Sequence, residues 1–543
     1  MNEKMAQHYD AVIVGAGFSG LYLVKRLRDA GFSVIALEAA PSVGGTWYWN
    51  TYPGARCDLE VYDYSYSFSR ELVEEWDWSE RYPSQPELLK YLNWVADRLD
   101  LRKDIALNTR VEAASYDEAR NLWSVRTGTG EALSARFCIM AGGGLSVPQV
   151  PDFPEIDSYK GDIYHTGHWP QSPVDFEGKR VAVIGTGSSG VQVSTTIADD
   201  VSQLTVFQRT PNYTVPLLNY PLDQAALDAF RDTAEERFAL SRTSRFGVPI
   251  QFPSNSALEA TPEEREEKYQ YAWDNSHLLA YRLTYGDLLY NVEANNTVSE
   301  FLRNKIRQIV KDPETAEKLC PKSFHFGTKR PCLGKGYYEM YNQPHVKLVD
   351  INETPIVRFT GRGIETAEGE LPFAAVVFAT GFDALTGAAS MIDITGRGGL
   401  TLKEKWKFGP EAYLGLATHD FPNLFFVTGP GSPGPLSAMV RSIEQHVEWI
   451  GDCLVYMRDH DCAAIEADRE AEVEWMDHVQ DVVSATLYPT ANSWYLGANV
   501  PGKPRKFLPY IAGIGLYRQK CDAVADAGYE GFALEREARP ATA

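Results

Sequence analysis

The glycine pattern G-x-G-x-x-G occurs twice in this chain, each time between a short apolar run and a helical pattern. The six glycines are Gly15, Gly17 and Gly20 in the first copy and Gly185, Gly187 and Gly190 in the second. In each copy the first glycine makes a tight turn, the second lets the backbone approach a pyrophosphate, and the third allows the helix to pack closely. Two such units predict an α/β protein with two Rossmann-like dinucleotide-binding domains.

The residue at the end of the second strand distinguishes the two units. Glu38 lies eighteen residues after Gly20, where a carboxylate accepts hydrogen bonds from ribose hydroxyls. The same count from Gly190 reaches Gln208, which Arg209 follows. A planar guanidinium binds a 2′-phosphate that an acid would repel, although Arg209 could equally be a solvated surface charge. We therefore predict FAD in the first unit and NADPH in the second.

Length and charge limit what else the chain can be. Its 543 residues predict two to four folding units, and a net charge of −21 disfavours a nucleic-acid partner. No window approaches the roughly 18 uninterrupted apolar residues of a membrane span, and the polar lead before the first strand does not resemble a signal peptide. We expect a cytoplasmic protein with no membrane partner.

The cysteines argue against several chemistries. There are seven, an odd number, and none forms a C-x-x-C pair. This pattern disfavours a disulfide framework, a zinc ribbon and a dithiol redox centre. His165 and His168, three residues apart, have no further cysteine or histidine at ligand spacing, so we expect no metal.

The order of motifs predicts how the domains are arranged along the chain. A buried strand in FAAVVFATGFDA is where the chain could re-enter the first domain, and residues 222–330 are mostly polar helices that could cover an active site or form a structural layer. Thr261 with Glu264, and Asp312 before Pro313, predict helix starts. The expected segments are 1–146 (FAD domain), 147–221 (NADP domain), 222–330 (helical insertion), 331–380 (NADP domain) and 381–543 (FAD domain).

Two further motifs carry a family resemblance. The first set comprises Gly45, Trp47, Tyr52, Pro53, Gly54 and Asp58, and the second comprises Gly161, His165, Trp169 and Pro170, which lie between the two nucleotide folds. Both sets resemble motifs of the Baeyer–Villiger monooxygenases, class B flavoprotein monooxygenases. The segments YPGARCD, FGTKR and LSVPQVPDFP resemble the phenylacetone and steroid monooxygenase branch. Tyr159 departs from the phenylalanine that usually begins the second motif.

The resemblance implies NADPH- and O2-dependent conversion of ketones to esters or lactones. In that chemistry a flavin C4a-peroxide attacks the ketone carbonyl and a tetrahedral adduct rearranges, with sulfoxidation as a side activity. Trp169 favours ketone oxygenation over the related N- or S-hydroxylating monooxygenases. A flavin-binding redox sensor or scaffold is the non-enzyme alternative. The family contains many monomers, so a monomer is expected.

The resemblance also assigns site residues. It implies Arg330 as the catalytic cation, Asp58 as the residue that orients it, Trp494 as part of a closing lid, and His165 as the residue that holds the interdomain connection. For the substrate pocket it implies Gly434, Pro435 and Leu436. For FAD it implies Gly15, Gly17, Ser19, Gly20, Glu38, Thr46, Trp47, Asp58, Tyr64, Val111 and Met439. For NADP it implies Thr186, Gly187, Ser188, Ser189, Gly190, Gln192, Arg209, Thr210, Lys329, Arg330 and Trp494.

Overall fold

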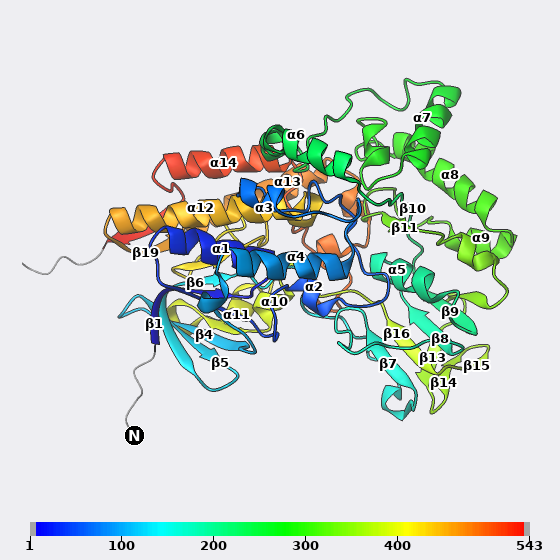
Figure 1. Cartoon of the computed structure of the whole chain (residues 1–543), viewed down its shortest axis with the longest axis horizontal. Helices are drawn as coiled ribbons and strands as arrows, with labels where there is room; N and C mark the ends of the chain where they lie inside the picture. The colour runs from blue at the N-terminus through cyan, green and yellow to red at the C-terminus, as the bar shows by residue number, and fades with distance from the viewer. Residues whose placement is uncertain (1–6, 537–543) are drawn as a thin grey trace, which may run out of the picture.

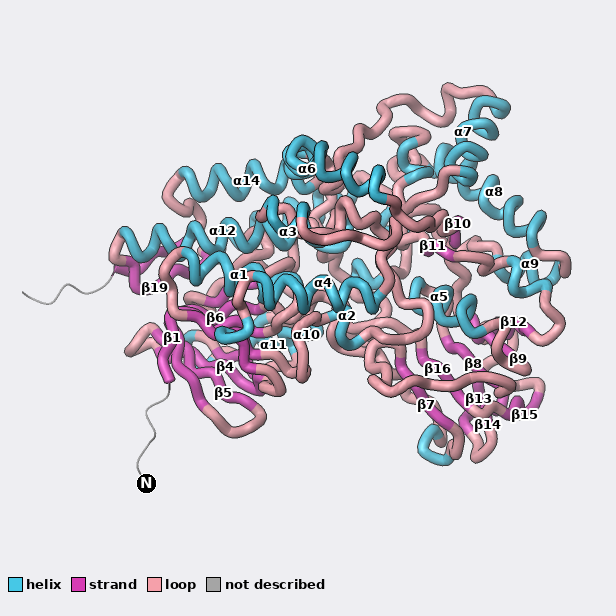
Figure 2. Tube along the Cα trace, in the orientation of Figure 1, coloured by secondary structure: helices cyan, strands magenta, loops and turns pink. Residues whose placement is uncertain are grey.

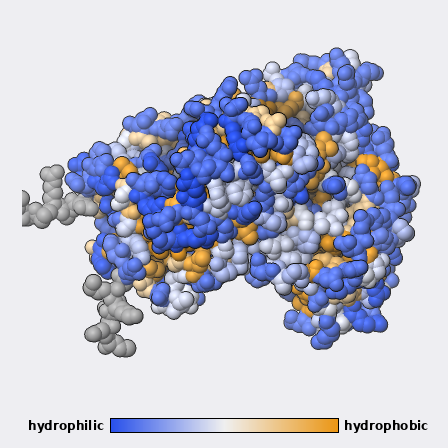
Figure 3. Space-filling view, in the orientation of Figure 1, coloured by the Kyte–Doolittle hydropathy of each residue, from blue (hydrophilic) through white to orange (hydrophobic). Residues whose placement is uncertain are grey.

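The computed structural model describes residues 7–536 and forms two sheet-containing lobes joined along one side (Figure 1). The outer ends of the expected first and last segments, residues 1–6 and 537–543, lie outside the described residues. Figure 2 shows the strands gathered at the lower side of each lobe, with most helices above them. The face in Figure 3 is mostly hydrophilic, with apolar side chains in small separate groups.

The first lobe is built on an eight-stranded sheet in the order β17-β4-β5-β6-β1-β2-β3, with β18 paired to β6. Its central strands β18, β6, β1 and β2 are parallel, as a dinucleotide fold requires, whereas β4 and β5 pair antiparallel. The strands are β1 (Gln7–Val14), β2 (Val34–Leu37), β3 (Ile105–Ala106), β4 (Val111–Asp117), β5 (Leu122–Thr127), β6 (Ala132–Met140), β17 (Asp393–Thr395) and β18 (Leu424–Phe426). Both ends of the chain therefore contribute to this sheet.

Long amphipathic helices cover one face of the first sheet. They are α1 (Phe18–Asp29), α4 (Gln85–Arg98), α12 (Met439–Asp459) and α14 (Ile514–Asp526), stacked above the strands in Figure 1. Their apolar sides form the largest core with the buried faces of β1 and β6. The opposite face of the sheet carries a smaller core under β4, β5 and β17.

The second lobe contains a five-stranded, fully parallel sheet in the order β12-β9-β8-β16-β7. Its strands are β7 (Asp162–His165), β8 (Arg180–Ile184), β9 (Gln203–Gln208), β12 (Val346–Asp350) and β16 (Ala375–Phe378). Helix α5 (Ser188–Ile197) follows β8, as the second glycine pattern predicts. β16, the predicted strand of FAAVVFATGFDA, lies between β8 and β7, and the chain then returns to the first sheet through β17.

Helices dominate the segment between the strands of the second sheet. They are α6 (Gln224–Thr243), α7 (Pro262–Asp274), the 3₁₀ helix η3 (Ala280–Leu283), α8 (Val292–Ile309) and α9 (Pro313–Leu319). The predicted starts are confirmed: Thr261 and Glu264 form a reciprocal capping box, and Asp312 accepts a hydrogen bond from Thr315 N. α6 contacts α14 and the short helix α3 (Arg70–Glu74) of the first lobe, and a separate core links α7, η3 and α8. The fold class expected from the sequence is thus observed.

Shorter elements complete the chain. They are α2 (Thr46–Trp49), α3 (Arg70–Glu74), α10 (Gly387–Ser390), α11 (Leu402–Lys405), α13 (Arg469–Ser484), β10 (Thr214–Pro216), β11 (Cys332–Gly334), β13 (Ile356–Phe359), β14 (Gly363–Thr366), β15 (Gly369–Pro372), β19 (Cys462–Ala467) and β20 (Phe532–Arg536). Within residues 7–536, no helix is both long and apolar enough to span a bilayer.

Candidate active site

The two glycine turns have nearly the same geometry. Gly15 (φ +106°) and Gly185 (φ +120°) adopt a conformation that side chains disfavour, and a Cβ on either would lie within 2.7 Å of a backbone oxygen of the neighbouring strand end. A Cβ on Gly20 or Gly190 would overlap the oxygen of the first glycine of its own turn. Helices α1 and α5 then begin without a side-chain cap. Their first N–H groups are therefore available to a pyrophosphate.

Glu38 lies directly beneath the first turn. Its side chain is buried, and its two oxygens accept hydrogen bonds from Ala16 N (2.8 Å) and Ala40 N (2.9 Å). Burial raises the pKa of Glu38, while these backbone N–H groups act in the opposite direction. The carboxylate holds the glycine turn in place, and its remaining lone pairs suit the ribose hydroxyls of FAD.

The second unit presents two cations where the first presents an acid. Arg209 is exposed at the end of β9, and Lys329 is close enough that burial, together with Arg209, lowers the pKa of Lys329 to about 8. Lys329 Nζ lies 4.6 Å from the centre of the Phe324 ring, and within residues 7–536 neither side chain forms an ion pair with a carboxylate. Two neighbouring cations without a counter-ion suit a dianionic phosphate, which is the group that distinguishes NADP from NAD. Phosphate binding by Arg209 stays a prediction, because an exposed side chain without a counter-ion is also what a surface charge would show.

The pairing of Asp58 with Arg330 is the central feature between the two lobes. Arg330 Nε and Nη2 donate to the two oxygens of Asp58 (2.5 and 2.7 Å), and Nη1 donates to Pro435 O (2.9 Å). Burial opposes the charge of Arg330, but Asp58 outweighs it and holds the pKa of the guanidinium above its ordinary value. The predicted catalytic, orienting and pocket residues thus meet at one point although Asp58 and Arg330 are 272 positions apart.

A mostly apolar cavity lies against Arg330. The space between its walls is about 530 Å³, a figure that includes open solvent. Its walls comprise Leu59 after Asp58, Phe246, Val248, Leu278, Leu279 and Arg282 of the insertion, Phe326, Gly327 and Pro331 around Arg330, Pro435 to Ala438, and Tyr488 and Tyr495 near the C-terminus. Two of the predicted pocket residues, Pro435 and Leu436, line it, and Gly434 (φ +46°) begins the 3₁₀ helix η6 (Gly434–Leu436) that carries them. The helical insertion therefore covers this site.

The loop of residues 44–58 connects the two lobes. Tyr52 OH donates to Gln192 Oε1 (2.7 Å), and Gln192 Nε2 donates to Arg56 O (3.1 Å). A Cβ on Gly54 would lie 2.2 Å from Thr196 Oγ1, so only glycine fits against α5. The side chain of Gln192, predicted to bind NADP, is thus engaged with this loop, a role that the sequence did not indicate.

His165 lies where the chain crosses between the lobes in both directions. Its Nδ1 accepts from Gly167 N (2.9 Å), and its Nε2 lies 3.3 Å from both Gln149 O and Thr380 Oγ1. Gln149 precedes the second sheet and Thr380 follows its strand β16, so one imidazole contacts both crossings. Burial lowers the pKa of His165, and with Nδ1 accepting, the neutral ring donates from Nε2.

The other residues of the second motif pack around this crossing. Trp169 is buried against Tyr164 and Phe176, as its predicted anchoring role requires, and Pro170 follows it. A Cβ on Gly161 would meet the hydroxyl of Tyr159, which donates to Phe373 O (3.0 Å). Tyrosine at 159 therefore gains a hydrogen bond that the usual phenylalanine lacks. His168, which the sequence left without a role, stacks on Trp49 of the first lobe (5.6 Å).

The remaining predicted residues are distributed around the two turns. Trp47 meets Tyr64 edge to face (5.8 Å), and its buried indole N–H has no acceptor within the described chain, as a donor waiting for a ligand would. Thr186 Oγ1 donates to Thr210 O (2.8 Å), which ties the second turn to the end of β9. The others are Ser19 in α1, Thr46 in α2, Val111 at the start of β4, Ser188 and Ser189 in α5, Met439 at the start of α12, and Trp494 in the 3₁₀ helix η8 (Trp494–Leu496).

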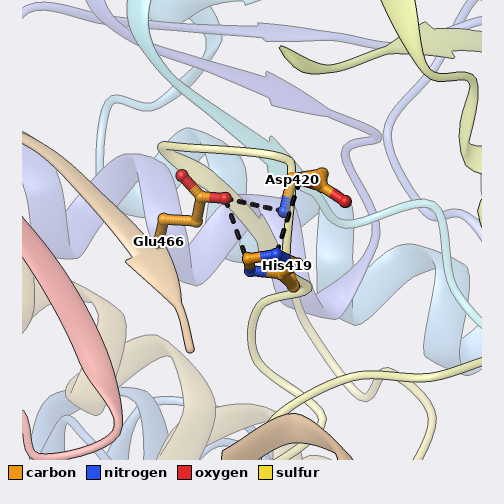
Figure 4. Close-up of side chains that lie close together, drawn as sticks. All are labelled: His419, Asp420 and Glu466. Atoms are coloured by element: carbon orange, nitrogen blue, oxygen red, sulfur yellow. Dashed lines mark hydrogen bonds and ion pairs between the residues drawn. The ribbon is translucent and has the colours of Figure 1, made fainter. Parts of the chain in front are cut away.

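One group outside this site has the spacing of a metal site. His419, Asp420 and Glu466 place their ligand atoms within 4.8 Å of one another (Figure 4). Glu466 already forms an ion pair with Arg397 (2.7 Å) and accepts from Asp420 N (2.7 Å), while His419 Nδ1 lies 3.0 Å from Ala467 O. These contacts join the 419–420 loop to β19. The oxygen and nitrogen atoms that could bind a metal thus already have partners in the protein.

The fold and the site together define a flavoprotein oxidoreductase with one FAD domain and one NADP domain. A family model for pyridine nucleotide-disulphide oxidoreductases matches residues 12–220. A Baeyer–Villiger monooxygenase from Pseudooceanicola batsensis is 43% identical and covers 98% of this chain and 97% of its own length. A solved steroid monooxygenase bound to NADP is 47% identical, with a TM-score of 0.93 over 98% of this chain and 100% of that one. The chain belongs to the Baeyer–Villiger monooxygenases, which use FAD and NADPH.

Two further comparisons refine this assignment. The residues that the disulfide-oxidoreductase model matches contain both glycine turns, and the seven cysteines of this chain are buried. A phenazine N-monooxygenase from Lysobacter antibioticus is 42% identical and covers 98% of this chain and 98% of its own length. Oxygenation at nitrogen therefore occurs in a protein as similar to this chain as its ketone-oxidising relatives.

Proposed function

We propose that this enzyme uses O2 and NADPH to convert ketones into esters or lactones, with Arg330 as the fixed cation of the site. The observation that carries the proposal is the Asp58–Arg330–Pro435 arrangement at the wall of an apolar cavity. When bound, reduced FAD supplies the activated oxygen. Arg330 stabilises the negative charge that develops on the ketone oxygen, because a preorganised charge in a site poor in water needs no reorganisation during the reaction.

The geometry leaves Arg330 free to act on the substrate. Three of the five guanidinium N–H groups are engaged by Asp58 and Pro435, so two remain for substrate or cofactor. Asp58 fixes the plane of the guanidinium and keeps it charged. Arginine suits the role since it cannot give up its proton at neutral pH.

The remaining predicted residues are proposed to hold the two cofactors. Gly15, Gly17, Gly20 and Glu38 would hold the pyrophosphate and ribose of FAD, and Trp47 would donate its unsatisfied N–H. Arg209 and Lys329 would bind the 2′-phosphate of NADPH. The kcat/KM of the Arg209→Ala variant with NADPH and with NADH tests this, because an unchanged NADPH preference would contradict the assignment.

A specific observation supports N-oxygenation as a second activity, namely the phenazine N-monooxygenase among the relatives. Incubation with NADPH, 18O-labelled dioxygen, a ketone panel and an aromatic N-heterocycle, analysed by mass spectrometry, separates the candidates. Labelled ester supports the proposed function, labelled N-oxide alone supports the second activity, and NADPH oxidation without a labelled product would indicate a redox sensor. We further infer a cytoplasmic location, supported by seven buried cysteines that form no disulfide. The family resemblance alone implies a monomer.

A further inference from the structure

The cavity beside Arg330 contains a second arginine, Arg282, whose charge is unpaired. Arg282 belongs to η3, and its guanidinium carbon lies 4.3 Å from the centre of the Phe246 ring. Within residues 7–536 the side chain has no hydrogen bond and no ion pair, whereas Arg330 has both. The side chain is half-buried, so its guanidinium stays within reach of solvent and can bind an anion that enters the cavity.

The contact of Arg282 with the Phe246 ring uses none of its N–H donors. It is an attractive cation–π contact. The N–H groups of the guanidinium therefore remain available for a bidentate acceptor such as a carboxylate. Burial raises the pKa of Tyr495, and Arg330 and Arg282 both act against that rise. The two guanidinium groups therefore lie within electrostatic reach of one phenol, in the same cavity.

We propose that the substrate is a ketone that also carries a carboxylate, with Arg282 binding the carboxylate and Arg330 facing the ketone oxygen. The hydrocarbon between the two groups would lie on Leu278, Leu279, Phe326 and Leu436, which line the cavity. This inference rests on the proposed function and adds the substrate class. It requires no change in the chemistry, because the carboxylate takes no part in the oxygen transfer.

The test uses a homologous series of methyl-ketone carboxylic acids and their methyl esters, which share a skeleton and differ in charge. For the parent enzyme, kcat/KM for the acids should peak at one chain length and exceed that of the matching ester. The Arg282→Gln variant should lose about 10- to 100-fold in kcat/KM for that acid, mainly through KM, and change less than about threefold for its ester. Arg282→Lys should recover part of the loss because it keeps the charge.

A neighbouring arginine provides the control. Arg245 lies over the same Phe246 ring (5.8 Å) but donates to Tyr290 OH and does not line the cavity, so Arg245→Gln should leave the preference for the acid unchanged. FAD content and melting temperature establish that each variant is folded. The inference would be overturned if Arg282→Gln lost kcat/KM equally for the keto acid and its methyl ester, or lost it for neither. The proposed ketone oxygenation would still stand in both cases. Failure of the parent enzyme to oxygenate any ketone would instead refute the proposed function.

Discussion

Replacement of Arg330 is the sharpest test of the site because it separates electrostatic catalysis from cofactor reduction. Arg330→Ala removes the guanidinium, its two bonds to Asp58 and its bond to Pro435 O. Loss of one preorganised donor from an oxyanion site costs about 2.7 to 4 kcal/mol, so ester formation should fall by about 10²- to 10³-fold. Reduction of bound FAD by NADPH should change less than about threefold, since that step develops no charge on the ketone oxygen.

The same change also destabilises the fold, and this effect has to be separated. It leaves Asp58 unpaired in a partly buried position, where breaking an ion pair costs about 3 to 5 kcal/mol. The side chains are 24% and 21% exposed, so we expect the lower end of that range. The double variant Asp58→Asn with Arg330→Ala removes the unpaired charge and should regain most of this stability.

The assay combines stopped-flow reduction of the flavin with the yield of ester per NADPH consumed. We expect normal reduction in both variants, little ester in either, and hydrogen peroxide as the replacement product. Arg330→Lys should have intermediate yields because it keeps a charge but not the bidentate geometry. Ester yield near that of the parent enzyme in Arg330→Ala, or recovery of ester together with stability in the double variant, would refute a catalytic role for Arg330.

Three further predictions concern the cofactor sites and the fold. The 2′-phosphate of NADPH binds the protonated form of Lys329, whose pKa is about 8 before NADPH binds. NADPH affinity should therefore weaken above pH 8, by about tenfold at pH 9. Binding titrations of NADH, and of NADPH to Lys329→Gln, should show little dependence on pH. His165→Ala should lower ester yield per NADPH more than flavin reduction, and unchanged coupling would contradict its role at both crossings. Burial lowers the pKa of His446 to about 3, so its contribution to stability is complete above about pH 6.5 and decreases on acidification, by about 2 kcal/mol at pH 5. Urea unfolding should show a shallower acid loss for His446→Gln, and an equal slope in both proteins would exclude His446 as the cause.

The parts of this site that the sequence predicts are those set by neighbours along the chain. The glycine turns, the acid after the second strand and the Thr261 capping box depend on residues within about forty positions, and spacing alone indicates them. Physical rules connect each residue type to its place: glycine to a positive φ, a carboxylate to backbone N–H groups, and threonine to a helix start. These features need no knowledge of the tertiary fold.

The remaining features depend on contacts that only the tertiary fold creates. Asp58 and Arg330 were paired through family resemblance, because a surface salt bridge would have the same sequence signature. The bond from Tyr52 to Gln192 and the stack of His168 on Trp49 join segments more than a hundred positions apart, and no motif indicates either. Arg282 was missed since a charged residue in a helical segment usually faces solvent.

The contacts of Arg330 make the orientation of the cation depend on how the two lobes meet. Arg330 follows the helical insertion, whereas Asp58 and Pro435 belong to segments of the first lobe, so the cation is oriented only when these parts meet. His165 contacts both chain crossings, and Gly54 lets the 44–58 loop rest on α5. The contacts that join the lobes therefore also set the position of the charge. An arrangement that opened the lobes would release the guanidinium from Asp58 and Pro435 and admit water to the cavity, and both changes weaken electrostatic stabilisation.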